Sequence, residues 1–243
     1  MLKINNLNKS YADKKAVDNL CLEVKKGEIF GFIGPNGAGK TTTIKMIVGI
    51  LKKDSGEILV NSLDNETRSI EVKRNIAYVP DNPDIQRKLK GIEYINFLAD
   101  LYDISKEDRL KTTNYLADLF EMKYALNDQI GSYSHGMQQK IVLMGALVTN
   151  PDLIILDEPM VGLDPKSAFN LKNLMKDLCK EGKTVFFSTH VLDVAEKFCD
   201  RVGIIAKGKL IASGTIDELR TQEGSNGSLE EIFLEITGEN YEK

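Results

Sequence analysis

Two kinds of hydrophobic pattern alternate along this chain. Short runs in which nearly every residue is apolar are typical of strands buried on both faces of a parallel sheet. Such runs occupy residues 29–33, 76–79, 153–156 and 184–188. Apolar residues at helical spacing predict helices over residues 168–179 and 191–198. The alternation of strand and helix predicts an α/β fold with a mostly parallel sheet.

Two regions depart from this alternation. From about residue 91 to 122, apolar positions recur at helical spacing with no strand between them, which predicts a helical insert. Its aromatic residues indicate packing, although any that are exposed would suit a groove for a partner helix. Residues 20–24 alternate apolar and polar, and residues 202–206 and 209–212 flank the turn Lys207-Gly208. We therefore expect an antiparallel β edge and a terminal hairpin.

Composition is typical of a soluble globular protein. The chain has 243 residues, of which 42% are hydrophobic and 28% are charged, enough for one large core or two lobes. The formal net charge of -4 gives no overall basic field, so we expect no nucleic-acid partner. The three cysteines, Cys21, Cys179 and Cys199, have no C-x-x-C spacing, which indicates reduced thiols rather than a disulfide or metal site.

No segment has the length of a membrane span. The longest apolar runs, such as residues 141–148, are far shorter than the roughly 18 residues that a span needs. The first residues also lack the apolar segment of a signal peptide. If the protein works at a membrane, we expect a separate chain to supply the spans.

Residues 34–42, Gly-Pro-Asn-Gly-Ala-Gly-Lys-Thr-Thr, carry the most specific chemistry. They satisfy the phosphate-loop pattern G-x-x-x-x-G-K-[ST] between a predicted strand and a predicted helix. Glycines let successive backbone N–H groups face a polyphosphate, and the helix N-terminus favours its charge. Lys40 would reach the β- and γ-phosphates, and the Thr41 hydroxyl would bind Mg²⁺. The alternative is a chance match in a surface turn, against which the flanking strand and helix argue.

Further candidates lie at the carboxyl ends of predicted strands, where open α/β sheets bind ligands. Asp157 and Glu158 follow residues 153–156, and we expect Asp157 near Mg²⁺ and Glu158 as general base or water-orienting group. The pair could instead form a capping turn before Pro159, but the phosphate loop favours the catalytic role. His190 ends the next strand and would contact the γ-phosphate, although a lone histidine is more often structural.

Together these residues resemble the ATP-binding subunits of ABC (ATP-binding cassette) transporters over nearly the whole chain. Residues 34–42 resemble the Walker A motif of that family, and residues 153–158 resemble Walker B with its catalytic glutamate. Gly162-Leu163-Asp164 is similar to the D-loop, and Ser188-Thr189-His190 to the switch histidine. The most discriminating match is Tyr133-Ser134-His135-Gly136-Met137-Gln138-Gln139-Lys140, which resembles the signature Leu-Ser-Gly-Gly-Gln.

The resemblance implies a fold and a division of the chain. The fold is an α/β P-loop NTPase core with a mostly parallel sheet, an N-terminal antiparallel β edge and an inserted helical subdomain. The ATP-binding domain would span residues 1–220. Within it, the core would occupy residues 1–80 and 150–220, and the helical insert about 82–149. Residues 221–243 would form an acidic C-terminal tail.

The resemblance also implies ATP and Mg²⁺ as ligands, with catalysis by Glu158, His190 and Lys40. Tyr11 lies where the family has an aromatic residue that stacks on adenine. The other residues implied to contact nucleotide are Asn36, Gly37, Gly39, Lys40, Thr41, Thr42, Ser134 and Gly136. The implied metal ligands are Thr41, Asp157 and Asp81.

The signature implies a shared site. In the family, the signature of one subunit covers the γ-phosphate held by the phosphate loop of another, so a head-to-tail dimer encloses two ATP molecules. Ser134 would donate a hydroxyl, and Gly136 would permit close backbone approach, while Ser134 also suits a helix N-cap. The implied function is ATP hydrolysis that energises transport through a separate transmembrane permease. The chain would then lie at the cytoplasmic face of the membrane with a second ATPase subunit, identical or not.

Two positions depart from the family pattern. Asp81 stands where Gln is usual, and although a carboxylate is a good Mg²⁺ ligand, it is shorter and charged, which puts the coupling role of that loop in question. His135 and Met137 replace Gly and Gln in the signature. His135 could add a donor near phosphate, but a tolerated variant is the preferred interpretation.

A narrower placement and two alternatives complete the prediction. The signature variant and residues 228–233 resemble exporter-type subunits of antibiotic-resistance and lantibiotic-immunity systems. A non-transport ABC ATPase acting on DNA or the ribosome would be expected to show a second cassette, a coiled-coil insert or a basic surface. None of these is visible in the sequence. A regulatory nucleotide-binding module without turnover would be expected to lack Glu158, which this chain has.

Overall fold

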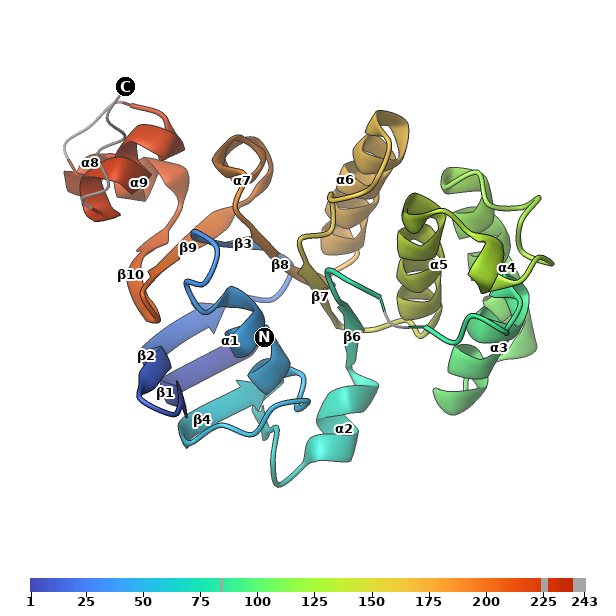
Figure 1. Cartoon of the computed structure of the whole chain (residues 1–243), viewed down its shortest axis with the longest axis horizontal. Coiled ribbons are helices and arrows are strands. Elements are labelled where there is room, and N and C mark those ends of the chain that lie inside the picture. Colours follow the sequence, from blue (N-terminus) through green and yellow to red (C-terminus); the bar gives the residue numbers. More distant parts are fainter. Residues whose placement is uncertain (84, 224–226, 238–243) are drawn as a thin grey trace.

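The computed structural model describes residues 1–83, 85–223 and 227–237, which form two sheets with helices around them (Figure 1). The larger sheet has the strand order β10-β9-β3-β8-β7-β6. Its strands are β3 (Ile29–Ile33), β6 (Ile76–Val79), β7 (Leu153–Asp157), β8 (Thr184–Thr189), β9 (Arg201–Ala206) and β10 (Lys209–Gly214). Neighbouring strands are parallel except β9 and β10, which form an antiparallel hairpin. The predicted mostly parallel sheet with a terminal hairpin is confirmed.

The central strands of this sheet are apolar on both faces because helices cover both sides. Every residue of β3, β7 and β8 is buried. The rings of Phe30 and Phe186, on adjacent strands, stack with their centroids 5.8 Å apart. This packing fixes the strand ends at which the functional residues lie.

A second sheet of antiparallel strands, in the order β2-β1-β4-β5, lies at the lower left of Figure 1. Its strands are β1 (Leu2–Tyr11), β2 (Lys14–Val24), β4 (Ser55–Val60) and β5 (Leu63–Asp64). Helix α1 (Lys40–Ile47) lies between this sheet and the larger one, and residues such as Ile44, Ile58 and Phe32 join all three in one core. The expected antiparallel β edge is therefore present, and it extends beyond the predicted strand at 20–24.

The opposite face of the larger sheet packs against helices, several of them from the insert at the right of Figure 1. The helices that follow α1 are α2 (Ser69–Arg74), α3 (Gly91–Leu101), α4 (Lys106–Leu119), the short 3₁₀ helix η1 (Ile130–Ser132), α5 (His135–Val148) and α6 (Pro165–Lys180). The helical stretch predicted at 91–122 is two helices, because the chain turns at Asp103 (φ +58°) and Ser105 starts α4 as its N-cap. The hydroxyl of Ser105 accepts the N–H of Asp108 at 3.1 Å.

The C-terminal helices form a third core cluster with the end of β3. They are α7 (Leu192–Phe198), α8 (Ile216–Glu223) and α9 (Leu229–Thr237). Leu229, Ile232 and Phe233 of α9 are buried in this cluster with Ala195 and Ile33. Helix α9 falls within the predicted acidic tail, of which residues 224–226 and 238–243 lie outside the described part of the chain. In the part that the structure describes, no helix has both the length and the apolar character needed to cross a bilayer.

Candidate functional site

The phosphate loop, residues 34–42, joins the end of β3 to the start of α1. Two of its glycines have left-handed backbone, with φ of +78° at Gly37 and +111° at Gly39. A Cβ atom at Gly39 would lie 2.5 Å from the carbonyl oxygen of Ala16 on β2, whereas one at Gly37 would meet no atom within 4 Å. Gly39 is therefore required where the loop passes against β2, while Gly37 faces open space.

Lys40, the first residue of α1, points back into the loop. Its Nζ donates hydrogen bonds to the carbonyl oxygens of Gly34 at 2.7 Å and Pro35 at 3.3 Å. The same Nζ lies 3.6 Å from Oε1 of Glu158. Burial lowers the pKa of the Lys40 ammonium, and the negative charges of Glu158 and Asp157 oppose that change. The ammonium therefore links the phosphate loop to the carboxylates at the ends of the strands.

Asp157 ends β7 and is almost completely buried, with 1% of its surface exposed. Its Oδ1 accepts a hydrogen bond from the Ser188 hydroxyl on β8 at 2.5 Å. Its Oδ2 has no hydrogen-bond partner among the described residues. A buried carboxylate oxygen is costly unless it is paired, and a hard cation would satisfy it.

Glu158 and His190 form a pair at the same sheet edge. Oε1 of Glu158 is 2.9 Å from Nδ1 of His190, which follows β8. The backbone of Glu158 is left-handed, with φ of +50°, and its N–H donates to the carbonyl oxygen and to the hydroxyl of Ser188, each at 3.2 Å. Backbone and side chain are thus both held, which gives the carboxylate a defined direction.

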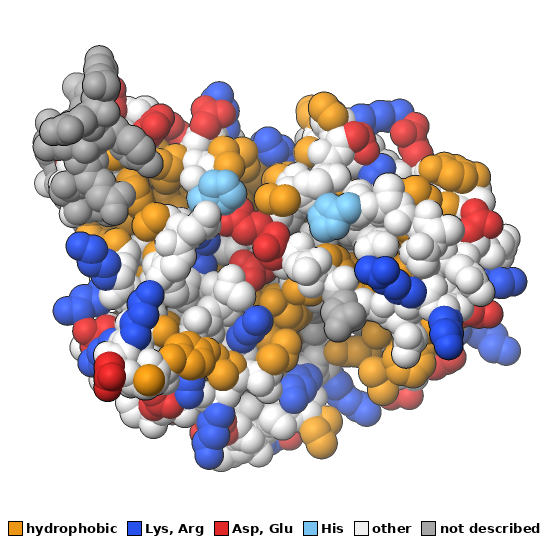
Figure 2. Space-filling model, in the orientation of Figure 1, with side chains coloured by type: hydrophobic (Ala, Val, Ile, Leu, Met, Phe, Trp, Pro, Cys, Tyr) orange, Lys and Arg blue, Asp and Glu red, His pale blue; other side chains and the backbone are white. Residues whose placement is uncertain are grey.

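Asp81 follows β6 and lies near the carboxylates of Asp157 and Glu158. Figure 2 shows both histidines of the chain on one face of the molecule, with acidic side chains between them. Partial burial and the negative charges of Asp157 and Glu158 raise the pKa of the Asp81 carboxyl, and His135 and His190 oppose the rise. A carboxyl whose pKa is raised by neighbouring negative charges would be relieved by a cation beside it.

The phosphate loop, the turn between β1 and β2, Asp81 and Glu158 surround a cleft of about 330 Å³, whereas Asp157 and His190 are not among its lining residues. Its lining residues are Tyr11, Lys14, Ala16, Pro35, Asn36, Gly37, Gly39, Lys40, Thr41, Thr42, Asp81 and Glu158. The structure thus brings the predicted nucleotide residues of the first half of the chain to one place with Glu158. Lys14 and Ala16 had not been predicted. Lys14 pairs with Tyr11 across a tight turn between β1 and β2, so a hairpin prediction there would have found it.

The signature residues Ser134 and Gly136 are not among the residues that line this cleft. Ser134 is the N-cap of α5, and its hydroxyl accepts the N–H of Met137 at 3.3 Å. Gly136 lies against the loop that follows Glu158, where an added Cβ would be 2.7 Å from the carbonyl oxygen of Gly162. Within one chain, the signature and the phosphate loop are therefore separate surfaces.

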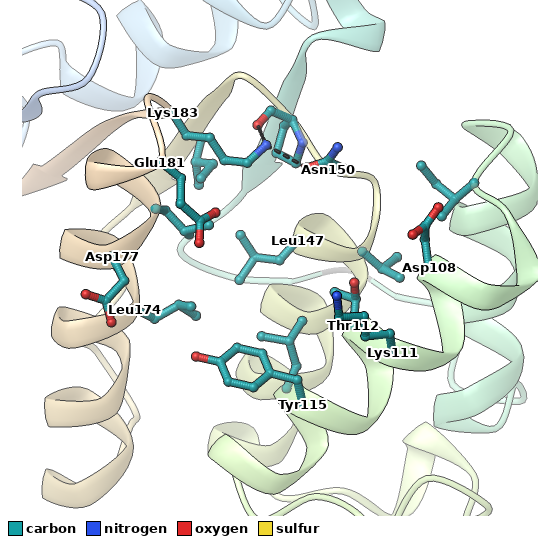
Figure 3. A pocket seen from close by; sticks show the side chains of 16 residues that line it. Asp108, Lys111, Thr112, Tyr115, Leu147, Asn150, Leu174, Asp177, Glu181 and Lys183 are labelled. Carbon is teal, nitrogen blue, oxygen red and sulfur yellow. Dashed lines mark hydrogen bonds between the residues drawn. The ribbon is translucent and has the colours of Figure 1, made fainter.

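A different hollow, of about 400 Å³, lies between α4, α5 and α6 (Figure 3). Apolar side chains such as Leu147 and Leu174 and the ring of Tyr115 point into it. Lys183 at its edge bonds to Asn150, 2.6 Å away. None of the predicted site residues lines this hollow.

The fold and the cleft define a class of protein. A phosphate loop at a helix N-terminus, a buried aspartate at the end of β7, a strand of the same parallel sheet, and a glutamate held by a histidine are the parts of a P-loop ATPase. The chain matches the family described as ABC transporter over residues 17–161, more than half of its length. It belongs to the ABC transporter family.

Similar proteins extend this assignment over nearly the whole chain. The linearmycin resistance ATP-binding protein LnrL of Bacillus subtilis is 35% identical over 226 residues, which are 93% of this chain and 73% of LnrL. A solved ATP-binding subunit of an ABC transporter has a TM-score of 0.94 and 32% identity, covering 98% of this chain and 99% of that one. A dimeric post-hydrolysis state of the ATP-binding cassette MJ0796, bound to ADP and Pi, has a TM-score of 0.81 and 27% identity, covering 89% and 99%. The chain is an ATP-binding subunit that hydrolyses ATP to energise transport.

Proposed function

We propose that this ATPase works in a composite site, formed by the cleft of one subunit and the signature of another, and that it drives a separate transmembrane subunit. One observation carries the proposal. The cleft contains Lys40 and Glu158, yet Ser134 and Gly136 lie on another surface of the same chain. A second ATP-binding subunit in head-to-tail arrangement would supply them.

In this site, Glu158 holds the attacking water and accepts its proton as the water oxygen bonds to the γ-phosphorus. The bond from that phosphorus to the bridging oxygen breaks, which leaves ADP and phosphate. His190, 2.9 Å from the carboxylate, keeps Glu158 aimed at the water. Lys40 exchanges its contacts with the loop carbonyl groups for the phosphate oxygens and stabilises their growing charge.

Asp157 and Thr41 would hold Mg²⁺, with Asp81 as a further ligand. The unpaired buried Oδ2 of Asp157 fits this role, since Mg²⁺ prefers oxygen ligands. When bound, the ion neutralises the phosphate oxygens and orients them for in-line attack. Tyr11, half exposed at the edge of the cleft, would stack on the adenine ring. The loop residues Asn36, Gly37, Gly39 and Thr42 would contact the phosphates through their backbone N–H groups.

Related proteins support the proposed partners. MJ0796 was solved as a dimer, and cbiO1, 27% identical with a TM-score of 0.76, is described as part of the ABC transporter complex cbiONQ. We infer a transmembrane permease as the partner and a position at the cytoplasmic face of its membrane. The likeness to LnrL, a linearmycin resistance protein, favours an exporter.

The Glu158→Gln variant tests the role of the general base. We expect steady-state hydrolysis to fall by at least about 100-fold, because general base catalysis contributes about that factor. ATP binding should persist, and gel filtration with ATP should detect a dimer. Glu181→Gln, an exposed change after α6, is the matched control and should retain full activity. Retained turnover in Glu158→Gln would remove this residue from the proposed role.

A further inference from the structure

The loop that leaves Glu158, residues 159–164, is attached to the signature helix α5 of the same chain. We refer to it as the Gly162 loop. Nζ of Lys140 on α5 lies 2.8 Å from Oδ2 of Asp164 at the end of the loop. The Lys140 side chain is 12% exposed and that of Asp164 is 50% exposed, so the ammonium is largely enclosed while the carboxylate remains open to water.

Steric fit reinforces the ion pair. An added Cβ at Gly162 would lie 2.5 Å from Cδ2 of His135, and one at Gly136 would lie 2.7 Å from the carbonyl oxygen of Gly162. The first turn of α5 and the Gly162 loop therefore leave no room for a side chain at Gly136, and at Gly162 the His135 ring occupies that space. His135, which replaces the glycine usual in the signature, covers Gly162 with its ring.

Asp164 is fixed from the other side as well. It is the N-cap of α6, and its carboxylate accepts the N–H of Ser167 at 2.9 Å and the Ser167 hydroxyl at 2.7 Å. Hydrogen bonds hold the pKa of the Asp164 carboxyl far below its usual value, with the largest effect from Lys140 and a smaller one from Ser167. The carboxylate thus stays charged at all physiological pH values and joins α5 to α6.

The same loop leads directly to the proposed general base. The N–H of Val161 donates to the carbonyl oxygen of Glu158 at 3.1 Å, which makes a turn between the strand end and the loop. Movement of the loop would therefore turn the backbone at Glu158. The signature would contact the ATP of the partner subunit, and Glu158 would act on the ATP of its own chain. Residues 159–164 and the ion pair between Lys140 and Asp164 link the two.

We propose that Lys140 is a positioning residue that fixes the Gly162 loop to the signature, so that Ser134, Gly136 and the loop meet the second subunit as one preformed surface. This role rests on the composite site of the proposed function. The ion pair itself exists within one chain. It can therefore be tested with and without the dimer.

The first test uses the single chain without ATP. In Lys140→Met, hydrogen exchange of the amides at 160–164 should accelerate by about tenfold, the effect of losing one charged hydrogen bond. Lys140→Arg should restore the slow rate because Arg keeps the charge and the carboxylate contact. Lys166→Met is the matched control: Lys166 also joins α6 to the helical insert, but its ion-pair partner, Glu121 at 2.6 Å, lies outside the loop. It should leave these amides unchanged.

The second test uses ATP-dependent dimers of Glu158→Gln. Adding Lys140→Met should raise the dimer dissociation constant by about tenfold, while ATP affinity of the monomer stays the same. Asp164→Asn, which keeps a side-chain oxygen for the N-cap, should have a similar effect, and the double variant should be no worse than either single one.

The outcomes separate the two proposals. Unchanged exchange in Lys140→Met overturns the positioning role, whatever the dimer does. Faster exchange with an unchanged dimer constant overturns the preformed surface but leaves the composite site intact. Absence of an ATP-dependent dimer with Glu158→Gln overturns the composite site, and with it the role of Lys140 in assembly.

Discussion

Gly37 and Gly39 show how differently two glycines of one loop are constrained. Both have positive φ, which costs a residue with a side chain about 1 kcal/mol. Only Gly39 lies against backbone, with the carbonyl oxygen of Ala16 2.5 Å from the position of an added Cβ. No backbone atom lies close to an added Cβ at Gly37. Substitutions at the two glycines therefore distinguish the cost of positive φ from the cost of steric overlap.

We expect Gly37→Ala to lower the free energy of unfolding by about 1 kcal/mol and Gly39→Ala by about 3 kcal/mol. The difference arises because the methyl group at 39 must push β2 away from the loop, whereas the methyl at 37 enters open space. Urea unfolding of the two variants beside the unaltered chain measures both values. Equal losses would mean that the contact with Ala16 is not a constraint on folding.

At the residue scale, the sequence predicted what depends on neighbours in the chain. The phosphate loop, Asp157 and Glu158 follow apolar runs, and that order is enough to place them at a sheet edge. The bond between Ser188 and Asp157 and the ion pair between Lys140 and Asp164 join residues more than twenty positions apart. Such contacts depend on which strands and helices become neighbours, and periodicity does not contain that information.

Helix α9 is held to the molecule by apolar residues on one side. Ile232 is fully buried, whereas Glu235 on the same helix is exposed. The N–H of Leu229, the first residue of α9, donates to Oε2 of Glu196 on α7 at 3.2 Å. The helix thus supports α7, which follows His190 directly.

Ile232→Ala should lower the free energy of unfolding by about 2–4 kcal/mol because it leaves a cavity between α9 and α7. Glu235→Ala, the matched control, should change it by less than about 0.5 kcal/mol. Chemical denaturation measures both. A small effect of Ile232→Ala would indicate that α9 is dispensable for the stability of this region.

At the element scale, the sequence predicted helices and strands most accurately where its pattern fitted only one type of element. Residues 76–79 match β6 throughout, since a short apolar run ended by proline can hardly be anything else. Helix α9 was not predicted as an element, because the acidic composition of residues 221–243 hid the spacing of Leu229, Ile232 and Phe233. The spacing of i, i+3 and i+4 was the signal that could have found it.

The whole molecule presents two incomplete surfaces, a cleft with catalytic residues and a signature without them. If they meet only between subunits, two inactive variants should repair each other. Ser134→Asp keeps the α5 N-cap but places a negative charge toward phosphate, and Glu158→Gln removes the base. In the mixed dimer, one of the two sites has both an unaltered Ser134 and an unaltered Glu158.

An equimolar mixture of Ser134→Asp and Glu158→Gln should therefore regain about a quarter of the normal ATPase activity, since half of the dimers are mixed and each has one intact site of two. Each variant alone should have almost none. A phosphate-release assay at saturating ATP checks this, and Lys40→Ala mixed with Glu158→Gln is the control. Both variants of that control alter the same half of the site, so the mixture should stay inactive. Failure of the first mixture to regain activity would contradict a shared site.

The strand order of the whole sheet lay beyond the sequence patterns. Residues 29–33 were predicted as a strand, but nothing in their periodicity places them between β8 and β9. That position depends on contacts between strands distant in the chain, such as Phe30 of β3 stacked on Phe186 of β8. The resemblance to a known family implied a mostly parallel sheet with an antiparallel β edge and a helical insert, but no strand order.

Glu158 has left-handed backbone, which any residue other than glycine adopts at a cost of about 1 kcal/mol. Glycine would remove that cost at once, and asparagine would reduce it. The chain instead keeps a glutamate there, whose backbone N–H donates to Ser188 and whose carboxylate lies 2.9 Å from His190. Folding stability would therefore favour glycine or asparagine at position 158, whereas ATP hydrolysis requires glutamate there. A search for hardier variants that ignored ATP hydrolysis would tend to discard the side chain on which hydrolysis depends.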